Sequence, residues 1–261
     1  AIRDLSSFNF SGSNARVRKF LGELPTAPGG GNGKALLGVL DGPQDFPGRR
    51  YRDLVYGTGL TLADSINTVQ GAIGMGPYTP ENGAVYPGGS FGEKLSQVAL
   101  LLKRTPVRVL GVNIGGWDNH TDQGATYGRH GNLLQSVGEG FRALYRDLQD
   151  QWENLIIVTM TEFGRTSREN GSLGTDHAYA TVMFVAGGAV QGNVYNCDSS
   201  TWAAGDMFSK RDRYVEHATD YRSVFADVFR WMGNSNLAQT IPNWSSLQGR
   251  ADFQSLGFLP A

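Results

Sequence analysis

Three short runs of nearly continuous apolar residues lie in the middle of the chain. They cover residues 107–114, 155–160 and 180–188. Apolar runs of this length are typical of strands buried on both faces of a parallel sheet. Between the first two runs, apolar residues recur at helical spacing over 129–151, which predicts an amphipathic helix. Its predicted buried face carries Leu133, Leu134, Val137, Phe141, Leu144 and Leu148.

Two further helices are predicted on either side of these runs. Ser90 and Glu93 have the spacing of a capping box and are expected to open a helix that ends near residue 104. A second amphipathic helix covers 219–233, with Thr219 as a plausible N-cap. Asp220 and Arg222 fit a capping role and a local ion pair. The alternation of strands and helices indicates an α/β fold with a mostly parallel or mixed sheet covered by helices.

Length and composition suit one large globular domain with a sizeable core. It has 261 residues, 36 glycines and a net charge of −1, so charge gives no reason to expect binding to nucleic acid. A single cysteine, Cys197, excludes an internal disulfide and a cysteine-based zinc site. No apolar run is long enough for a transmembrane segment. We expect an N-terminal extension and Gly-rich linker over 1–34 and one α/β domain over 35–261, with further helices between 35 and 73.

The polar residues that follow the predicted strands are the candidates for metal binding. Asp118 and His120 come after the run 107–114 and a Gly-Gly turn, and Glu162 follows the run 155–160. Asp176 and His177 lie in the loop beyond. The carboxyl ends of strands are where open α/β sheets form their sites. Asp, Glu and His are also the ligands that suit a hydrolytic metal, so these five residues are predicted metal ligands.

Each of these positions also has a simpler interpretation. Asp118 can cap a turn, and Glu162 can serve as a ligand, a general base or a helix N-cap. Arg165 can bind an anionic substrate oxygen or form a salt bridge with Glu162. Asp176 is either a ligand or the partner that orients an imidazole. No motif for a serine nucleophile or a phosphate-binding loop is present, so the nucleophile stays unassigned.

Several segments taken together resemble the DUF1501 family of bacterial proteins, over about residues 35–233. They are LLGVLDGP, GAVYPGGSFGEKLSQVALLLK, GGWDNHTDQG, TMTEFGRT with REN and GTDHA, VMFVAGGAVQGNVY, and TDYRSVFADVF. The resemblance implies the alkaline phosphatase-like clan, which includes sulfatases, and its three-layer sandwich. It implies a metal-dependent hydrolase of phosphate or sulfate esters that uses divalent ions, Zn or Mn. Asp118 and His120 resemble the clan's first ligand pair, and His177 resembles its later histidine.

Two departures from the family pattern bear on function. Glu162 stands where the clan has the Asp of an Asp-His-Gly motif, and the chain does not contain the N-terminal strand of the family. The resemblance therefore implies a fold that is incomplete at its N-terminus and is completed by self-association or by a second chain. The alternative function is a non-catalytic structural or assembly subunit that retains the fold. Export signals in many such proteins imply an extracytoplasmic location, periplasmic or secreted.

Overall fold

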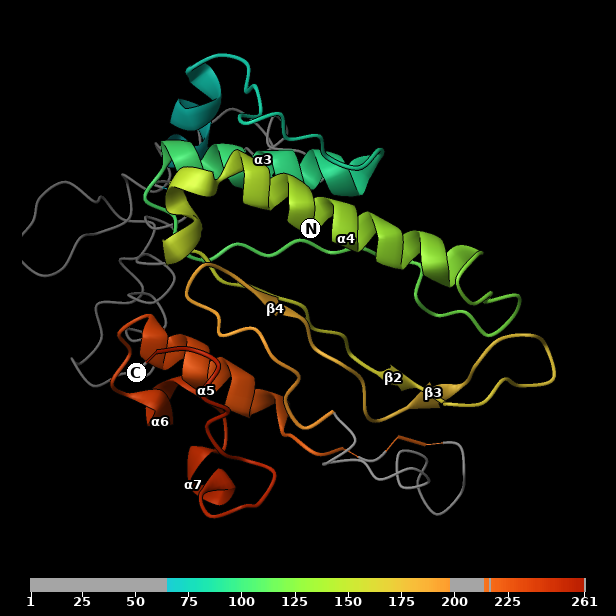
Figure 1. The fold of residues 1–261 in the computed structure, drawn as a ribbon. Helices are drawn as coiled ribbons and strands as arrows, with labels where there is room; N and C mark the ends of the chain where they lie inside the picture. The colour runs from blue at the N-terminus through green and yellow to red at the C-terminus, as the bar shows by residue number, and fades with distance from the viewer. Residues whose placement is uncertain (1–64, 198–213, 216, 261) are drawn as a thin grey trace, which may run out of the picture. The chain divides into compact units, whose positions relative to one another are not determined.

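The computed structural model describes residues 65–197, 214–215 and 217–260 (Figure 1). The chain divides into two compact units. The N-terminal unit comprises Ala1–Pro80 and Tyr86–Asn113, and the C-terminal unit comprises Glu81–Val85 and Ile114–Ala261. The predicted extension over 1–34 and the helices predicted over 35–64 lie outside the described residues.

The described part of the N-terminal unit is built on two helices. Residues 65–74 are helical, and α3 spans Ser90–Arg104. Ala72 of the first helix packs with Leu100 and Leu101 of α3 in a buried apolar cluster. At the end of α3, the Arg104 guanidinium donates to carbonyl oxygens of the first helix and the turn after it. A basic residue at this position also suits the negative end of the helix dipole.

The start of α3 differs from the sequence prediction. Gly89 is the N-cap, with φ 81°, and no side chain caps the helix. Ser90 is already helical, so the predicted capping box is wrong. The cause is backbone conformation, because the chain enters the helix through a glycine in the left-handed region, where a serine would be strained. Gly92 is equally constrained, since a Cβ there would lie 1.7 Å from the Pro87 carbonyl oxygen.

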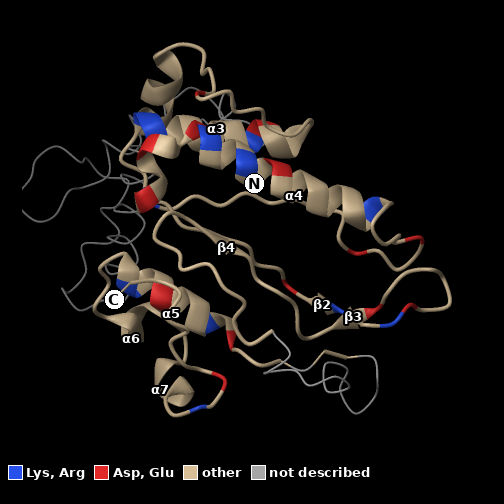
Figure 2. Cartoon of the chain, viewed as in Figure 1, with Lys and Arg blue, Asp and Glu red and all other residues tan. Residues whose placement is uncertain are grey.

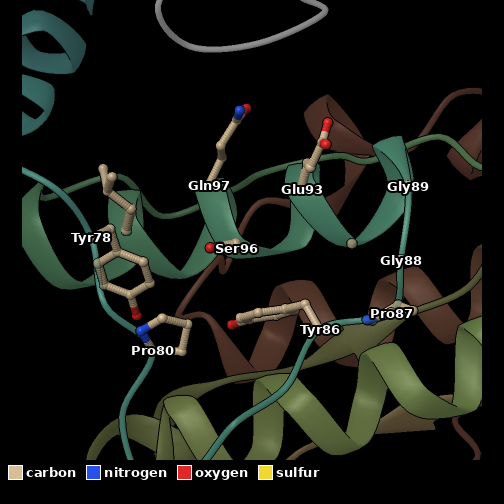
Figure 3. Close-up of a pocket in the computed structure, with 11 residues that line it drawn as sticks. Tyr78, Pro80, Tyr86, Pro87, Gly88, Gly89, Glu93, Ser96 and Gln97 are labelled. Atoms are coloured by element: carbon tan, nitrogen blue, oxygen red, sulfur yellow. The ribbon is translucent and has the colours of Figure 1, made fainter.

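A shallow groove of about 530 Å³ runs along α3 (Figure 3). Tyr78, Pro80, Tyr86 and Pro87 form one wall, and residues of α3 line the other. None of the predicted metal ligands lines this groove.

The segment 107–114 does not form the predicted buried strand. Residues 106–119 belong to no helix or strand, and the side chain of Val109 is 73% exposed. The apolar composition of a segment does not determine whether another strand lies beside it, because pairing depends on residues far away in the sequence.

The C-terminal unit confirms the long amphipathic helix. α4 spans Arg129–Asp147 and continues into the 3₁₀ helix η3, Gln149–Asn154. Leu144 and Leu148 of the predicted face are buried, whereas Leu134 is 42% exposed and was wrongly included. Asp147 is fully buried and accepts a hydrogen bond from the backbone of Glu81 at 2.8 Å.

Two short antiparallel ladders follow α4. β1 (Ile157–Val158) pairs with β4 (Val185–Ala186), and β2 (Gly164–Arg165) pairs with β3 (His177–Ala178). The runs 155–160 and 180–188 thus each contain a strand, as predicted, but these strands pair with each other in antiparallel orientation. The larger, mostly parallel sheet covered by helices stays a prediction.

Helix α5, Tyr221–Trp231, organises the end of the chain. One face packs against the C-terminal residues Phe258 and Leu259, and another packs on the short helices α6 (Leu237–Thr240) and α7 (Trp244–Leu247). Asp220, not Thr219, is the N-cap, and its carboxylate accepts from the Arg222 backbone N–H at 3.0 Å. The predicted ion pair of Asp220 with Arg222 is confirmed.

Candidate metal centre

Asp118 and His120 lie on one side of a tight turn in the C-terminal unit. Gly116 has φ 99°, and its carbonyl accepts a hydrogen bond from the Asn119 side chain at 3.0 Å. Asn119 is buried, whereas both of its flanking residues are exposed. The buried Asn119 therefore fixes the turn and leaves the carboxylate and the imidazole on the outer face.

The β2–β3 hairpin supplies the other side of the site. The register of the ladder places Arg165 directly opposite His177. Acidic and basic residues lie close together along this hairpin (Figure 2). Its loop is closed by backbone hydrogen bonds from Thr166 to Asp176 at 2.9 Å and from Asn170 to Gly174 at 2.8 Å.

Backbone hydrogen bonds hold the hairpin loop against the turn that carries Asp118. Thr175 N–H donates to the Asn119 carbonyl at 3.1 Å, and two more bonds join 122–123 to 172–173. Gly174 makes the close approach sterically feasible. A Cβ at this position would lie 2.2 Å from the carbonyl carbon of His120 and 2.3 Å from its oxygen.

These contacts bring three predicted ligands together. His177 Nε2 lies 2.8 Å and His120 Nε2 lies 3.1 Å from the same oxygen of Asp118, Oδ1. Within the described residues, these three form a group whose ligand atoms all lie within 4.8 Å of one another. Each side chain is about half exposed, so the group is open to solvent.

Asp118 is held in its ionised form. The hydrogen bond with His177 is the largest cause that lowers the pKa of Asp118 below its ordinary value. Burial opposes it, and a hydrogen bond with Arg165 and the charges of the two histidines lower the pKa further. Arg165 NH1 lies 2.6 Å from Asp118 Oδ1. Because metal ligands must be deprotonated, this environment suits a ligand carboxylate.

The imidazole rings are fixed from several sides. His120 Nδ1 lies 3.3 Å from Asp176 Oδ1. His177 stacks on His120 with ring centroids 5.0 Å apart and on Phe163 with centroids 4.1 Å apart. A carboxylate on the far nitrogen of a metal-binding imidazole is the usual outer partner of histidine ligands. Asp176 occupies this orienting position and is not part of the three-residue group.

Arg165 and Glu162 are placed differently from each other. Besides Asp118, the Arg165 guanidinium donates to the Thr175 hydroxyl at 2.9 Å and to the Thr175 carbonyl. In the described part of the chain, its acidic partner is therefore Asp118 and not Glu162. Glu162 is exposed in a bend before β2 and lies outside the ligand group. The role of Arg165 toward a substrate stays a prediction, as does that of Glu162 as a ligand.

The donor set fits a divalent cation. His120 faces a carboxylate oxygen at each ring nitrogen, yet a neutral imidazole has one N–H and an ionised carboxylate only accepts. A cation between Nε2 and Asp118 would be bound by both atoms, and Nδ1 could then donate to Asp176. Around a tetrahedral ion with bonds of about 2.0–2.1 Å, donors lie about 3.3 Å apart, so the distances to Asp118 would need to open only slightly.

Sequence reasoning missed the residues that hold the ligands in place. Asn170 bonds to the His120 backbone and to the Asp176 carboxylate, and Thr175 bonds to Arg165. A signal for Asn170 was available, because Asn followed by Gly is typical of tight turns. Nothing in the local sequence indicated that its amide would reach another loop 50 residues away.

A family model described as "Protein of unknown function (DUF1501)" matches residues 80–237, more than half of the chain. The chain belongs to the DUF1501 family. The DUF1501 match contains all residues of the candidate centre, from the turn at Asp118 to His177. No curated protein and no solved structure matches this chain. Among the helices of the described residues, none has the length and hydropathy needed to cross a membrane.

Proposed function

We propose that this DUF1501 protein is a metal-dependent hydrolase of phosphate or sulfate esters. The observation that supports it is the convergence of two imidazole nitrogens on one carboxylate oxygen of Asp118. Three protein ligands with an open coordination position are typical of catalytic sites for zinc. The three side chains are about half exposed, which leaves room for a substrate.

The residues of the centre have distinct roles in this proposal. Asp118, His120 and His177 hold one divalent ion, Zn or Mn. When bound, such an ion polarises an ester oxygen and lowers the pKa of a bound water. Asp176 holds the His120 ring in orientation. Arg165 balances the charge of Asp118, and its guanidinium edge is the group proposed to contact a substrate anion.

Membership of the alkaline phosphatase-like clan is part of the proposal. We therefore also propose a three-layer sandwich with a mostly parallel sheet, a second ion held by Glu162, and an extracytoplasmic location. The position of Asp118 and His120 after the segment 107–114, with His177 at the start of β3 later in the chain, supports this membership. Crystal structure determination with soaked Mn²⁺ would test the second ion directly.

The test of the proposed reaction is hydrolysis of p-nitrophenyl phosphate and p-nitrophenyl sulfate. The protein is stripped with chelator and reloaded with Zn²⁺ or Mn²⁺. We expect turnover of one ester that depends on the ion and is lost in Asp118→Asn, because the amide cannot replace the ligand charge. Asp150→Asn, an exposed acidic residue of η3, is the matched control. No ion-dependent turnover of either ester would contradict the proposal.

One observation favours the alternative, a non-catalytic structural or assembly role. Asp118 is paired with Arg165, and the two loops of the centre are joined by backbone hydrogen bonds. The same residues can therefore anchor these loops to each other without an ion. In that case the protein would bind a second chain or copies of itself. Sedimentation analysis combined with metal analysis of the same purified sample distinguishes the two, since an assembly that contains no ion is expected only for the structural role.

A further inference from the structure

The two antiparallel ladders of the C-terminal unit lie on one pair of chain segments, which continue from one ladder to the other (Figure 1). Between the ladders, the first segment has five residues, 159–163, and the second has six, 179–184. The second segment therefore carries one extra residue, as in a β-bulge. Bulges are frequent next to active sites, where they redirect a side chain.

Exposure along the second segment locates the bulge. Before it, the exposed side chains are those of His177, Tyr179 and Thr181, at every second position. After it, the exposed side chains are those of Val182 and Phe184. Thr181 and Val182 are neighbours and both exposed, although neighbouring residues of a regular strand point to opposite faces. The extra residue therefore lies at this pair.

Packing on the other face agrees with this position of the bulge. Met183 and Val185 pack against the apolar core formed by α5 and the C-terminal residues. Phe184 lies between them and therefore points away from that core. Because His177 and Met183 are an even number of positions apart, a regular strand would put both on one face. The bulge places Met183 in the core and leaves Phe184 on the face that carries His177.

Three exposed side chains with apolar bodies thus follow His177 on one face: Tyr179, Val182 and Phe184, here named the apolar strip. They are 92%, 51% and 50% exposed. At about 3.3 Å per residue, the strip extends roughly 20 Å from His177. The ring of Phe163, which stacks on His177, adds apolar surface next to the ligand. Exposed apolar side chains that lie together typically mark a binding surface.

We propose that the apolar strip binds the hydrocarbon chain of an anionic ester whose charged head lies at the candidate metal centre. This inference rests on the proposed function and names its substrate class, an amphiphile with a phosphate or sulfate head. The head is attracted by the bound cation and by the Arg165 guanidinium beside it. The side chains of the strip carry no charge and suit an apolar group. A single aromatic ring would contact one of them at a time, because they lie two or three residues apart, whereas an extended chain contacts all three.

The test is the affinity of alkylphosphonates of different chain length for the Zn²⁺-loaded protein, measured by isothermal titration calorimetry. Methylphosphonate provides the head alone, and octylphosphonate, used below its micelle concentration, adds the chain. Each methylene group that the strip buries raises the affinity by up to about fourfold, so we expect octylphosphonate to bind more than about tenfold more tightly. Equal dissociation constants for the two phosphonates would overturn the inference.

The double variant Val182→Ser/Phe184→Ser assigns the gain in affinity to the strip. We expect it to lose most of the gain for octylphosphonate and to bind methylphosphonate as the wild type does. The matched control is Met160→Ser, because Met160 is 68% exposed but lies two residues after Val158, on the face that packs toward α5. This control should keep the gain. If the double variant does not fold, Tyr179→Ser, at a side chain that packs against almost nothing, is measured instead. A gain that persists in the folded strip variant would overturn the inference.

Failure of the proposed function gives a different result. If neither phosphonate binds, the centre holds no anion, and both proposals are overturned. If octylphosphonate shows the gain but no p-nitrophenyl ester is hydrolysed, the hydrolase is wrong and the chain-binding role of the strip stands. If a second copy of the chain covers the strip instead, the double variant will change the sedimentation coefficient and leave both dissociation constants unchanged, which would also overturn the inference.

Discussion

At the scale of single residues, the ligand types of the centre follow from sequence, but their contacts do not. Asp118 and His120 could be predicted as a pair, since alternate residues of a short turn reach the same side, and the buried Asn119 accounts for this. The pairing of Arg165 with Asp118 could not be predicted, because it depends on the register of β2 with β3 and on how that hairpin meets a distant turn.

Gly174 provides a test of how closely the two loops must approach. In Gly174→Ala the new methyl group would overlap the backbone of His120, which cannot move as a flexible side chain can. Overpacking of this kind costs about 1–3 kcal/mol. We expect the free energy of unfolding to fall by about this amount in urea denaturation, together with weaker Zn²⁺ binding.

Gly171→Ala is the matched control in the same loop. A Cβ at Gly171 would have no atom within 4 Å, so its stability and its Zn²⁺ affinity should stay close to those of the wild type. Equal losses of stability in both variants would show that the hairpin loop does not approach the turn as described.

Asp252 gives a prediction for pH. The Arg250 guanidinium, with Nε 2.9 Å from Asp252 Oδ1, lowers the pKa of Asp252 to about 2. Because the folded value lies below the ordinary value of about 3.9, the charged pair stabilises the fold above that pH. This contribution is lost as the pH falls through about 2. In Arg250→Gln we expect the pKa of Asp252 to rise toward its ordinary value in an NMR titration, and an unchanged pKa would contradict this explanation.

At the scale of elements, the periodicity of hydrophobic residues along the chain predicted helices better than strands. The starts of α4 and α5 lie within two residues of their predictions, because an amphipathic face needs only a core to pack against. The caps were less predictable. Gly89 opens α3 through its backbone conformation, so the sequence spacing of Ser90 and Glu93 was misleading. The segment 107–114 remained unpaired with any described strand, since strand pairing is decided by distant residues.

The two N-cap assignments can be tested together. Asp220 is 8% exposed, caps α5 and pairs with Arg222, so Asp220→Ala should lower the free energy of unfolding by about 1–3 kcal/mol. Ser90→Ala removes no cap and should change it by less than about 0.5 kcal/mol. Urea denaturation followed by circular dichroism measures both. A loss in Ser90→Ala as large as that in Asp220→Ala would restore the capping-box interpretation of α3.

At the scale of the whole molecule, the described residues form two compact units within the α/β domain predicted over 35–261. All ligand residues of the candidate centre belong to the C-terminal unit. Of the five ligands predicted from the sequence, the structure brings three together, and all three lie within the segment that matches DUF1501. Neither the sequence nor the family match indicated Asn170 and Gly174, which fix the geometry of the candidate centre. Their roles arise only when two loops distant in sequence meet.

The central claim is that Asp118, His120 and His177 bind a divalent ion. The most direct test is the metal content of the purified native protein, measured by inductively coupled plasma mass spectrometry. We predict about one Zn or Mn per chain, as three protein ligands imply one ion, and its loss in a His120→Ala/His177→Ala double variant. The control variant His217→Ala, which alters a histidine paired with Asp252, should keep the ion. A wild-type protein without bound metal, even after incubation with Zn²⁺ and Mn²⁺, would contradict the claim.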